Sequence, residues 1–518
     1  MKITIESNYL IFPVGTVSAP KELIFSDGTD VVYNIVVKLD NYAPDFYAYI
    51  DVKRFKGKTL DLSVEPEMEL IFKECDTIDV ENLYHEPTRP QIHFTAKNGW
   101  LNDPNGLIYI DGTYHMFFQH NPGDVHWRKS KHWGHAISKD LIHWEETDIA
   151  LFPDKRGAMF SGSAILDHNN VLGKNEGENK AAVLFYTTTS PYCQNMSYST
   201  DNFKTINHYE GNPIIPFIDD RNRDPKVVFC DELNCYVMIL YITDNLYYLF
   251  TSDNLTGWTH IQSINLNVER ECPDIFHIND NEGNRKWVIM GARDKYLVGK
   301  FEGGKFIPEQ DTMSLHYGAC AYAGQSFSNL PNNRVVRMVW NRWYVKPNSF
   351  SGQMGIPMEL SLIKLNDIYY LQANPVEEIK TLYNGIRKFE NITVLPENEF
   401  KTNLTDSPYM FKIKGDHRNS GNLNICAFGR NIEVDFTKNE LKLADCIAPI
   451  SITKKNFEIT VIMDRCGMEI FTDGGKAYMS CLIDYAAMDR NLQYFTLKSD
   501  ETLQINELEM ITLNSIWS

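Results

Sequence analysis

The feature that most constrains the fold is a repeat of five apolar runs through the middle of the chain. The runs begin at Tyr114, Ala181, Cys235, Lys286 and Arg334, so their starts are 67, 54, 51 and 48 residues apart. Each run is short and rich in β-branched and aromatic residues, which is typical of a buried strand. A spacing near 50 residues is close to the length of one four-stranded propeller blade. The repeat therefore predicts a five-bladed β-propeller.

A polar segment after each of the first three runs supports the repeat. The segments are "SKDLIHW", "STDNFKTI" and "TSDNLTGW", in which Asp140, Asp201 and Asp253 recur. We expect the last two copies to be in register, with Phe203 matching Leu255, and the first copy to be one residue shorter. Chance similarity between short strand-forming segments is the alternative.

At 518 residues the chain is too long for a single core, and its patterning predicts an all-β protein of several domains. Residues 1–87 are strand-like and form a small N-terminal β-rich domain of unknown role. The propeller is expected over 88–370, followed by a linker with a short helix over 371–390. Residues 391–518 contain short strands with Asp-Gly and Gly-Gly turns, which indicate an antiparallel β-sandwich.

Charge and composition narrow the partners. The formal net charge is -18 at pH 7, which disfavours nucleic acid and anionic membrane surfaces. A neutral small molecule or polymer is the expected partner, and a homodimer formed through an edge of the sandwich is an open alternative. The start of the chain lacks a continuous apolar segment and no run reaches membrane-spanning length, so we expect a cytoplasmic protein. Ten irregularly spaced cysteines are expected to be reduced thiols.

Three carboxylates stand out at the predicted blades. Asp103 in "WLNDPNG", Asp224 in "NRDPKVV" and Glu271 in "RECPDIF" fall in the first, third and fourth repeats. The innermost strands of a propeller converge on a central channel, so these side chains can meet at one end of it. An isolated Asp-Pro is more often a turn opener that accepts backbone hydrogen bonds. Glu271 is harder to explain in that way, because Glu is disfavoured in a buried strand.

Five motifs now carry a resemblance. "WLNDPNG", "FFQHNP", "MFSGSA", "RDP" and "ECPDIF" occur in this order, and the chain from about residue 88 to 518 resembles glycoside hydrolase family 32, the invertases, levanases and inulinases that act on β-fructosides. The resemblance implies a five-bladed propeller followed by a β-sandwich, which agrees with the blade count. It also implies a reaction without a metal or organic cofactor.

The resemblance assigns roles to the three carboxylates. Asp103 would be the nucleophile that forms a covalent fructosyl-enzyme, and Glu271 the acid and then the base. We expect the pKa of Glu271 to be raised by burial and by the Asp103 charge. Asp224 would hold ring hydroxyls of the fructosyl unit, and Arg223 could orient Asp224.

The resemblance also suggests residues that bind the substrate. The expected hydroxyl partners are Asn102, Gln119 and Ser161, and the expected pocket walls are Trp127, Phe160 and Trp340. Tyr322 is a weaker candidate, because the family usually has an aromatic residue where this chain has Ala321. Packing between blades is the alternative for the aromatic residues.

Cations and histidines near these motifs leave two questions. Arg128, Lys129 and Lys131 either line the mouth of the pocket and affect leaving-group recognition, or belong to a solvated loop. The nearby histidines do not repeat a metal-ligand spacing, so core or loop roles are expected and no metal site is predicted for His93, His120, His126, His132 and His135.

The sequence therefore predicts a retaining β-fructosidase that releases terminal fructose from levan, inulin, fructo-oligosaccharides or sucrose. "SGQMGIPMELSL" and "MGARDKYLVGKFEGG" look more like levanase and inulinase members than like plain invertases, which favours an exo-acting fructanase. The alternatives are a fructosyltransferase, a hydrolase of sucrose or sucrose 6-phosphate, and a non-catalytic carbohydrate-binding protein. The sequence does not indicate the linkage preference.

Overall fold

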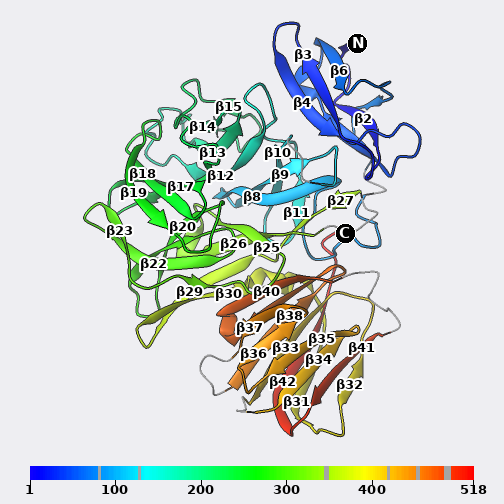
Figure 1. The fold of residues 1–518 in the computed structure, drawn as a ribbon, viewed down its shortest axis with the longest axis vertical. Helices are drawn as coiled ribbons and strands as arrows, with labels where there is room; N and C mark the ends of the chain where they lie inside the picture. The colour runs from blue at the N-terminus through cyan, green and yellow to red at the C-terminus, as the bar shows by residue number, and fades with distance from the viewer. Residues whose placement is uncertain are drawn as a thin grey trace.

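The structure is a computed structural model that describes residues 1–79, 83–126, 130–343, 349–416, 420–450, 456–483 and 492–517. Strands dominate, and the helical elements in these ranges are short 3-10 turns. Figure 1 shows an N-terminal body in dark blue, a larger central body running from cyan to yellow-green, and a C-terminal body in orange and red. The all-β prediction of a five-bladed propeller, a sandwich and a small N-terminal domain is confirmed.

The central body consists of five sheets, each built on four consecutive antiparallel strands with additional short strands in three of them. From the channel outward, blade one contains β8 (Gly99–Ile110), β9 (Thr113–Asn121), β10 (His132–Ser138) and β11 (Trp144–Glu146), and blade two contains β12 (Met159–Leu166), β13 (Ala182–Thr189), β14 (Tyr192–Ser199) and β15 (Asn207–His208). Blade three contains β16 (Arg223–Cys230), β17 (Cys235–Thr243), β18 (Leu246–Ser252) and β19 (Thr259–Asn265). Blade four contains β20 (Asp274–Asn279), β21 (Arg285–Met290), β22 (Lys295–Glu302) and β23 (Lys305–Pro308), and blade five contains β25 (Ala321–Ser326), β26 (Val335–Asn341), β29 (Met358–Leu365) and β30 (Ile368–Pro375). The short strands β24 (Met313–Ser314), β27 (Phe350–Ser351) and β28 (Gln353–Met354) pair with β22, β8 and β26.

The five apolar runs form the second strand of each blade, as the repeat predicts. β9, β13, β17, β21 and β26 each lie between an inner and an outer strand. Their side chains are largely buried, because each blade packs against its two neighbours. The apolar character of these runs therefore follows from their central position in each sheet.

In the polar segment after each of the first three runs, a side-chain oxygen accepts backbone N–H groups, and we call this segment a cap. The alignment of the three caps differs from our expectation. Asp140 accepts hydrogen bonds from two backbone N–H groups, and Asp201 accepts one from the backbone of Thr205. In the third copy Asn254, not Asp253, has this role. The first and third copies are in register because both place a left-handed Leu after the cap, whereas the second copy is one residue longer.

The N-terminal domain has two sheets around its own core. The first sheet has the order β1 (Lys2–Thr4), β6 (Thr59–Glu65), β3 (Lys21–Ser26) and β4 (Val31–Val37), and the second has β5 (Phe46–Asp51), β2 (Tyr9–Val14) and β7 (Lys73–Cys75), with the 3-10 turn η1 at Lys53–Phe55. Alternating burial along β4 and β6 directs every second side chain inward. The domain therefore folds around its own apolar cluster.

The edge strand β4 is covered by the loop that joins β9 to β10. Val36 donates its N–H to Ser130 Oγ at 3.0 Å and accepts a hydrogen bond from Asn121 Nδ2 at 3.2 Å, and Lys38 N–H donates to the Gly123 carbonyl at 3.1 Å. The Lys38 ammonium lies 3.7 Å from Asp124, and both side chains are buried. This loop therefore satisfies the backbone edge that an outer strand leaves open.

The C-terminal body is a sandwich of two six-stranded sheets. One sheet contains β31 (Tyr383–Val394), β42 (Leu503–Leu513), β33 (Tyr409–Asp416), β38 (Asn456–Met463), β39 (Gly467–Thr472) and β40 (Ala477–Leu482). The other contains β32 (Phe400–Asn403), β41 (Tyr494–Ser499), β34 (Asn422–Ala427), β35 (Arg430–Asp435), β36 (Glu440–Leu443) and β37 (Cys446–Pro449). The remaining 3-10 turns are η2 (Pro331–Asn333), η3 (Glu377–Leu382) and η4 (Asp473–Gly475).

The connection between propeller and sandwich is shorter than expected. Strand β30 continues to Pro375 and β31 begins at Tyr383, so the expected linker over 371–390 contains strand residues at both ends. Only η3 lies between the two strands, and it is a 3-10 turn. A short connection suits two bodies that share a continuous apolar cluster.

A buried ion pair joins the start of the propeller to the sandwich. His93 Nδ1 lies 2.8 Å from Asp464 Oδ2, and Asp464 also accepts the backbone N–H groups of Gln91 and Ile92. Burial alone lowers the pKa of His93, but the carboxylates of Asp464 and Glu469 outweigh it and raise this pKa to about 9. His93 is therefore a charged structural residue at the junction, consistent with the expected core role.

Two further findings concern the whole chain. The ten cysteines are free thiols, and among the residues that the structure describes no helix is long and apolar enough to cross a membrane.

Candidate active site

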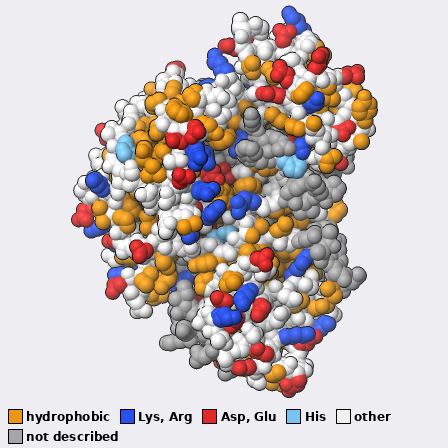
Figure 2. All heavy atoms as spheres, in the orientation of Figure 1, with side chains coloured by type: hydrophobic (Ala, Val, Ile, Leu, Met, Phe, Trp, Pro, Cys, Tyr) orange, Lys and Arg blue, Asp and Glu red, His pale blue; other side chains and the backbone are white. Residues whose placement is uncertain are grey.

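The three predicted carboxylates converge on one end of the propeller channel. Asp103 lies on β8, Asp224 on β16 and Glu271 just before β20, and all three line one pocket of about 630 Å³. The Cys272 thiol lies 3.5 Å from Asp103 Oδ2 and 3.3 Å from Asp224 Oδ2. Figure 2 shows acidic and basic side chains gathered near the middle of the propeller part of this face. Residues from three blades are thus close enough to act on one ligand.

Irregular backbone aims these side chains into the channel. The pairing of β8 with β9 shifts between Leu101 and Pro104, and that of β16 with β17 shifts between Arg223 and Lys226. Proline has no N–H to give to the ladder, so each Asp-Pro pair sits where the strand bulges. The Asp103 motif is therefore a bulge within a strand, not a turn between strands.

Left-handed backbone in the third blade and just before the fourth directs side chains into the channel as well. Glu271 and Cys272 have φ values of 30° and 41°, and Asp224 has a φ of 66°. Non-glycine residues seldom adopt this region, and such strain collects at functional sites. The backbone N–H of Cys272 donates to Asp224 Oδ2 at 3.0 Å, which holds the two strand ends together.

Asp103 has a hydroxyl donor and a cation nearby. Ser161 Oγ donates to Asp103 Oδ2 at 2.7 Å. Burial raises the pKa of Asp103 to about 7, the negative charges of Asp224 and Glu271 add to this rise, and Lys131 and Ser161 oppose it. In the ligand-free structure Asp103 is therefore protonated below neutral pH.

Glu271 is held by a cation and a phenol. Arg223 donates from Nε at 3.1 Å and from Nη2 at 2.6 Å to Glu271 Oε2, and Tyr322 Oη donates to Oε1. Burial alone raises the pKa of Glu271, but Arg223 and Tyr322 outweigh it, so this pKa is lower than usual. The expectation of a raised pKa is wrong, because motif spacing does not show these two contacts.

Arg223 contacts the expected partner, Asp224, and also Glu271. Its guanidinium lies 3.6 Å from Asp224 Oδ2, and it donates hydrogen bonds to Glu271 Oε2 and to the Arg221 carbonyl. The backbone N–H of Asp224 instead donates to Thr187 Oγ1 at 3.0 Å. Burial raises the pKa of Asp224, and Arg223 opposes that rise.

The predicted binding residues divide into three groups. Phe160 and Ser161 line the pocket, and Trp340 packs edge to face against Tyr322 with ring centroids 6.4 Å apart. Asn102 and Gln119 lie behind the surface: Asn102 Oδ1 accepts the Asp103 backbone N–H, and Gln119 is fully buried and donates to the Met159 carbonyl. Trp127, Arg128 and Lys129 lie outside the described residues.

Two of these positions differ from the sequence-based view. Ser161, expected to bind a sugar hydroxyl, donates to the candidate nucleophile in the ligand-free structure. Tyr322, expected to be a weaker candidate, contacts the candidate acid directly. Both therefore tune the carboxylates in the empty site.

The sequence did not decide whether Lys131 lines the pocket or lies in a solvated loop, and the structure places it in the pocket. Its side chain is buried beside Asp103, with Nζ 4.0 Å from the centre of the Phe160 ring. Burial lowers the pKa of Lys131, while Asp103 and the other two acids oppose this. Lys131 is thus a site residue and not part of a solvated loop.

Sequence reasoning missed the rim of the pocket. Thr189, Ser190 and Tyr192 come from the turn between β13 and β14, and Asp220 and Arg221 precede β16. The one signal in the sequence for these rim residues was the position of the turn between β13 and β14, which directly follows the second apolar run. In the described residues no group of His, Cys, Asp and Glu could hold a metal ion.

Comparisons with known proteins match a family model and several characterised enzymes. A model of the glycosyl hydrolases family 32 N-terminal domain matches residues 93–375. A levanase of Bacillus subtilis is 28% identical over 84% of this chain and 72% of its own length, and an extracellular exo-inulinase of Aspergillus awamori is 31% identical over 69% and 77%.

Solved structures share the fold. The exo-inulinase of Aspergillus awamori covers 84% of this chain and all of its own, with a TM-score of 0.74 and 24% identity. A β-fructofuranosidase of Schwanniomyces occidentalis covers 85% of this chain and all of its own, with a TM-score of 0.76 and 23% identity.

The fold and the family match together define a glycoside hydrolase. The chain belongs to glycosyl hydrolases family 32, the β-fructosidases.

Proposed function

We propose that the protein is an exo-acting fructan β-fructosidase that removes terminal fructose with retention of configuration. The observation that carries the proposal is the convergence of Asp103, Asp224 and Glu271 on one pocket. Family membership supplies the reaction class, and the levanase and exo-inulinase relatives favour a fructan as the substrate. Such a neutral substrate suits a chain with a net charge of -18 better than nucleic acid does.

In the first step the Asp103 carboxylate attacks the anomeric carbon of the terminal fructosyl unit. The bond to the leaving oxygen breaks as Glu271 gives that oxygen its proton, and a covalent fructosyl-enzyme forms. Asp224 accepts hydrogen bonds from ring hydroxyls as positive charge develops on the sugar. The bulged strands that carry the carboxylates hold them in place before the substrate arrives.

In the second step water replaces Asp103 at the anomeric carbon. Glu271 now removes a proton from that water, fructose leaves, and Asp103 regains its charge. Arg223 and Tyr322 stabilise the ionised form of Glu271, which is the form this step requires. The same contacts oppose protonation of Glu271, so they favour the second step over the first.

The reaction needs the charge on Asp103 and the proton on Glu271, whereas the ligand-free site favours the reverse. The two carboxyl groups share one proton in the active form, and this proton lies on Glu271. That arrangement is less populated than the one with the proton on Asp103. The ammonium of Lys131 favours that form because it stabilises an ionised Asp103.

Incubation with sucrose, inulin and levan, followed by timed sugar analysis, tests the proposal. An exo-acting hydrolase releases fructose as the sole small product from the start. A ladder of oligosaccharides would contradict exo attack, and kestose-like products at high sucrose would indicate a fructosyltransferase. Loss of release in both Asp103→Asn and Glu271→Gln would tie the activity to this pocket.

A further inference from the structure

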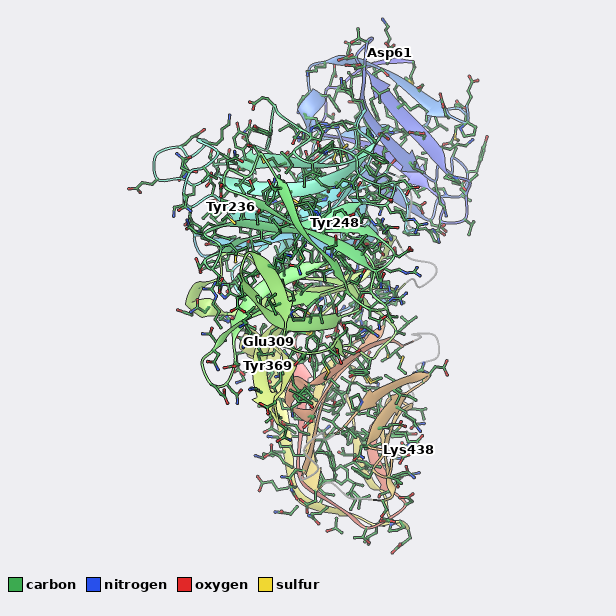
Figure 3. All side chains as sticks on the ribbon, turned by 60° about the vertical axis from the view of Figure 1, so that its left-hand side comes forward. Asp61, Tyr236, Tyr248, Glu309, Tyr369 and Lys438 are labelled. Carbon is green, nitrogen blue, oxygen red and sulfur yellow. The ribbon has the colours of Figure 1, made fainter. Side chains whose placement is uncertain are left out.

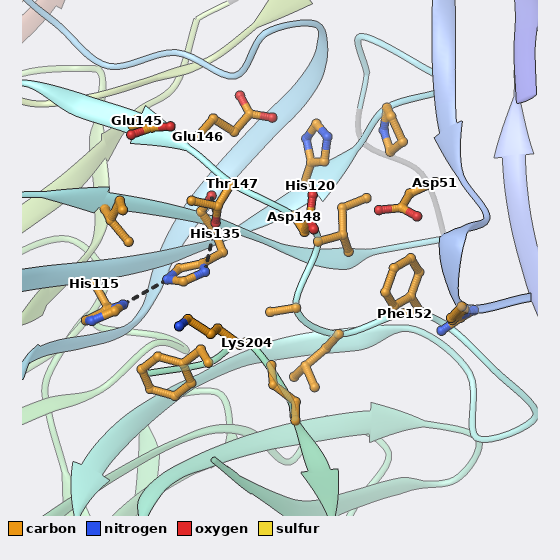
Figure 4. A pocket seen from close by; sticks show the side chains of 18 of the residues that line it. Asp51, His115, His120, His135, Glu145, Glu146, Thr147, Asp148, Phe152 and Lys204 are labelled. Atoms are coloured by element: carbon orange, nitrogen blue, oxygen red, sulfur yellow. Dashed lines mark hydrogen bonds between the residues drawn. The ribbon is translucent and has the colours of Figure 1, made fainter. Parts of the chain in front are cut away.

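A second pocket, larger than the first, lies between the N-terminal domain and the first two blades. Its volume is about 890 Å³, and it has no lining residue in common with the pocket of the three carboxylates. Figure 4 shows Asp51 and Phe152 close to the N-terminal strands at the right, and Glu145, His115 and His135 farther to the left. The family match, residues 93–375, includes the propeller part of this lining but not the part that the N-terminal domain contributes, and the proposed reaction does not use this space.

One carboxylate from the N-terminal domain faces this pocket without a full set of partners. Asp51, at the end of β5, is 5% exposed, and its Oδ1 accepts the Lys53 backbone N–H at 3.0 Å. No described residue donates a hydrogen bond to Oδ2, and Figure 4 shows the carboxylate directed toward the pocket. A carboxylate oxygen that faces the pocket in this state can accept a hydrogen bond from a ligand that brings its own donor.

The opposite wall adds acceptors. Glu146 Oε2 accepts the Lys97 backbone N–H at 2.7 Å, and Asp148 forms an ion pair with Lys53. Burial raises the pKa values of both Asp51 and Glu146, with the lysines opposing the rise. The wall therefore offers carboxylates whose ionisation a donor ligand would favour.

Aromatic rings supply the apolar part of the lining. The Tyr9 and Tyr49 rings meet edge to face with centroids 6.3 Å apart, and Phe152 stands on the propeller side. Rings and carboxylates in one pocket suit a ligand that has hydroxyl donors and C–H faces, which are the two surfaces of a sugar. The carboxylates disfavour an anion, and the lining cations disfavour a simple cation.

We propose that this pocket is a second binding site for a β-fructan chain, held by Asp51 and the tyrosine rings at a distance from the reacting bond. The inference rests on the proposed function, because that function supplies the polymer. A chain bound here stays close to the enzyme between cleavage events, which raises the effective concentration of its ends. The site gives the N-terminal domain a role in capturing polymer that sucrose does not need.

The matched test compares Asp51→Asn with Asp61→Asn. Both changes remove one charge from the N-terminal domain, but Asp61 lies on β6 outside the pocket, and Figure 3 labels it at the far end of that domain. We expect Asp51→Asn to raise KM for levan or inulin about threefold or more and to change kcat/KM for sucrose less than twofold. Asp61→Asn should change neither. Tyr49→Ala should repeat the Asp51→Asn result through loss of ring surface.

Direct binding separates this inference from the proposed function. Titration of Glu271→Gln with levan and inulin oligosaccharides should show two classes of site, and Asp51→Asn in that background should remove one. Equal effects of Asp51→Asn on polymer and sucrose, or two intact classes of site, would overturn the second site. A wild-type enzyme that hydrolyses no fructoside would overturn the proposed function instead, and the titration would still report on the pocket. Unchanged sucrose hydrolysis shows that Asp51→Asn, Asp61→Asn and Tyr49→Ala have folded, and thermal unfolding that matches the wild type shows the same for the variants made in the Glu271→Gln background.

Discussion

Arg223 Nη2 lies 2.6 Å from Glu271 Oε2, and this contact reverses the expected order of the two catalytic pKa values. The candidate acid is stabilised as a carboxylate, while burial keeps the candidate nucleophile protonated up to about pH 7. A site with this order is active when it holds one proton in total.

The pH profile of kcat/KM should therefore be bell-shaped, with the acid limb set by Glu271 and the alkaline limb set by Asp103. Below the lowered pKa of Glu271 both carboxyls are protonated and Asp103 cannot attack. Above about pH 7 both are ionised and no proton is available for the leaving group. We expect the acid limb to move to higher pH in Tyr322→Phe, because that variant loses a hydrogen bond that favours the carboxylate.

Tyr192→Phe is the control for that shift, since it removes a phenol from the rim of the same pocket. Its acid limb should match that of the wild type. If Tyr322→Phe also left the limb in place, the assignment of this limb to Glu271 would be wrong.

Asp103→Asn should lower kcat about 10³-fold or more and should also stabilise the protein. The folded pKa of Asp103 lies above its unfolded value, so its ionisation opposes folding increasingly as pH rises from about 4 to about 7. Above pH 7 the variant should gain about 1–3 kcal/mol over the wild type, and below pH 4 the difference should vanish. Thermal unfolding at several pH values measures this, with the exposed Asp220→Asn as the control. A gain that does not depend on pH would contradict the explanation.

His93→Gln should lower the stability of the folded protein at and below neutral pH, and this loss should become smaller as the pH becomes alkaline. The folded pKa of His93 is about 9, above the ordinary value of 6.5, so its contribution is complete below pH 6.5 and is lost as pH rises through 9. The difference between the wild type and His93→Gln should be about 2–3 kcal/mol at pH 6 and should shrink toward pH 9.

The control for this pair is His143→Gln, since His143 forms an exposed contact with Asp140 at 2.7 Å. An exposed pair contributes little, so that variant should show no comparable loss at any pH. A constant difference for His93→Gln between pH 6 and pH 9 would mean that packing, not charge, accounts for the effect.

Lys38→Met should weaken both the N-terminal interface and catalysis. The change removes the ammonium that faces buried Asp124, with an expected loss of about 3–5 kcal/mol. The same loop continues to Lys131 in the pocket, so kcat/KM for sucrose should fall about tenfold. Lys38→Met with Asp124→Asn should recover part of the lost stability, whereas Lys2→Met, at an exposed position on β1, should change neither quantity. A Lys38→Met enzyme with normal kcat/KM would separate the interface from the site.

Much of the fold could be predicted because it depends on local patterning. The spacing of the runs from Tyr114 to Arg334 follows from one buried strand per blade. The motif around Asp103 could be located because its proline produces a bulge in the strand. The cap register was wrong because Asp253 and Asn254 are adjacent and both can accept backbone N–H groups.

The electrostatics of the site could not be predicted in the same way. Glu271 meets Tyr322 and Arg223 only after blades three, four and five close around the channel. Lys131 is one of three neighbouring cations, and nothing in their spacing separates a pocket residue from a solvated one. Several of the hydrogen bonds that dock β4 use backbone atoms of Val36 and Lys38, and such contacts leave no signature in the sequence.

The covered edge of β4 makes the first domain part of the catalytic unit. A chain shortened to begin at the family match would lose every partner that Val36 and Lys38 give to the loop between Asn121 and Ser130. Exchange of the N-terminal domain between related enzymes should therefore succeed only if this loop is exchanged with it, because the two segments bind each other despite their separation in the chain.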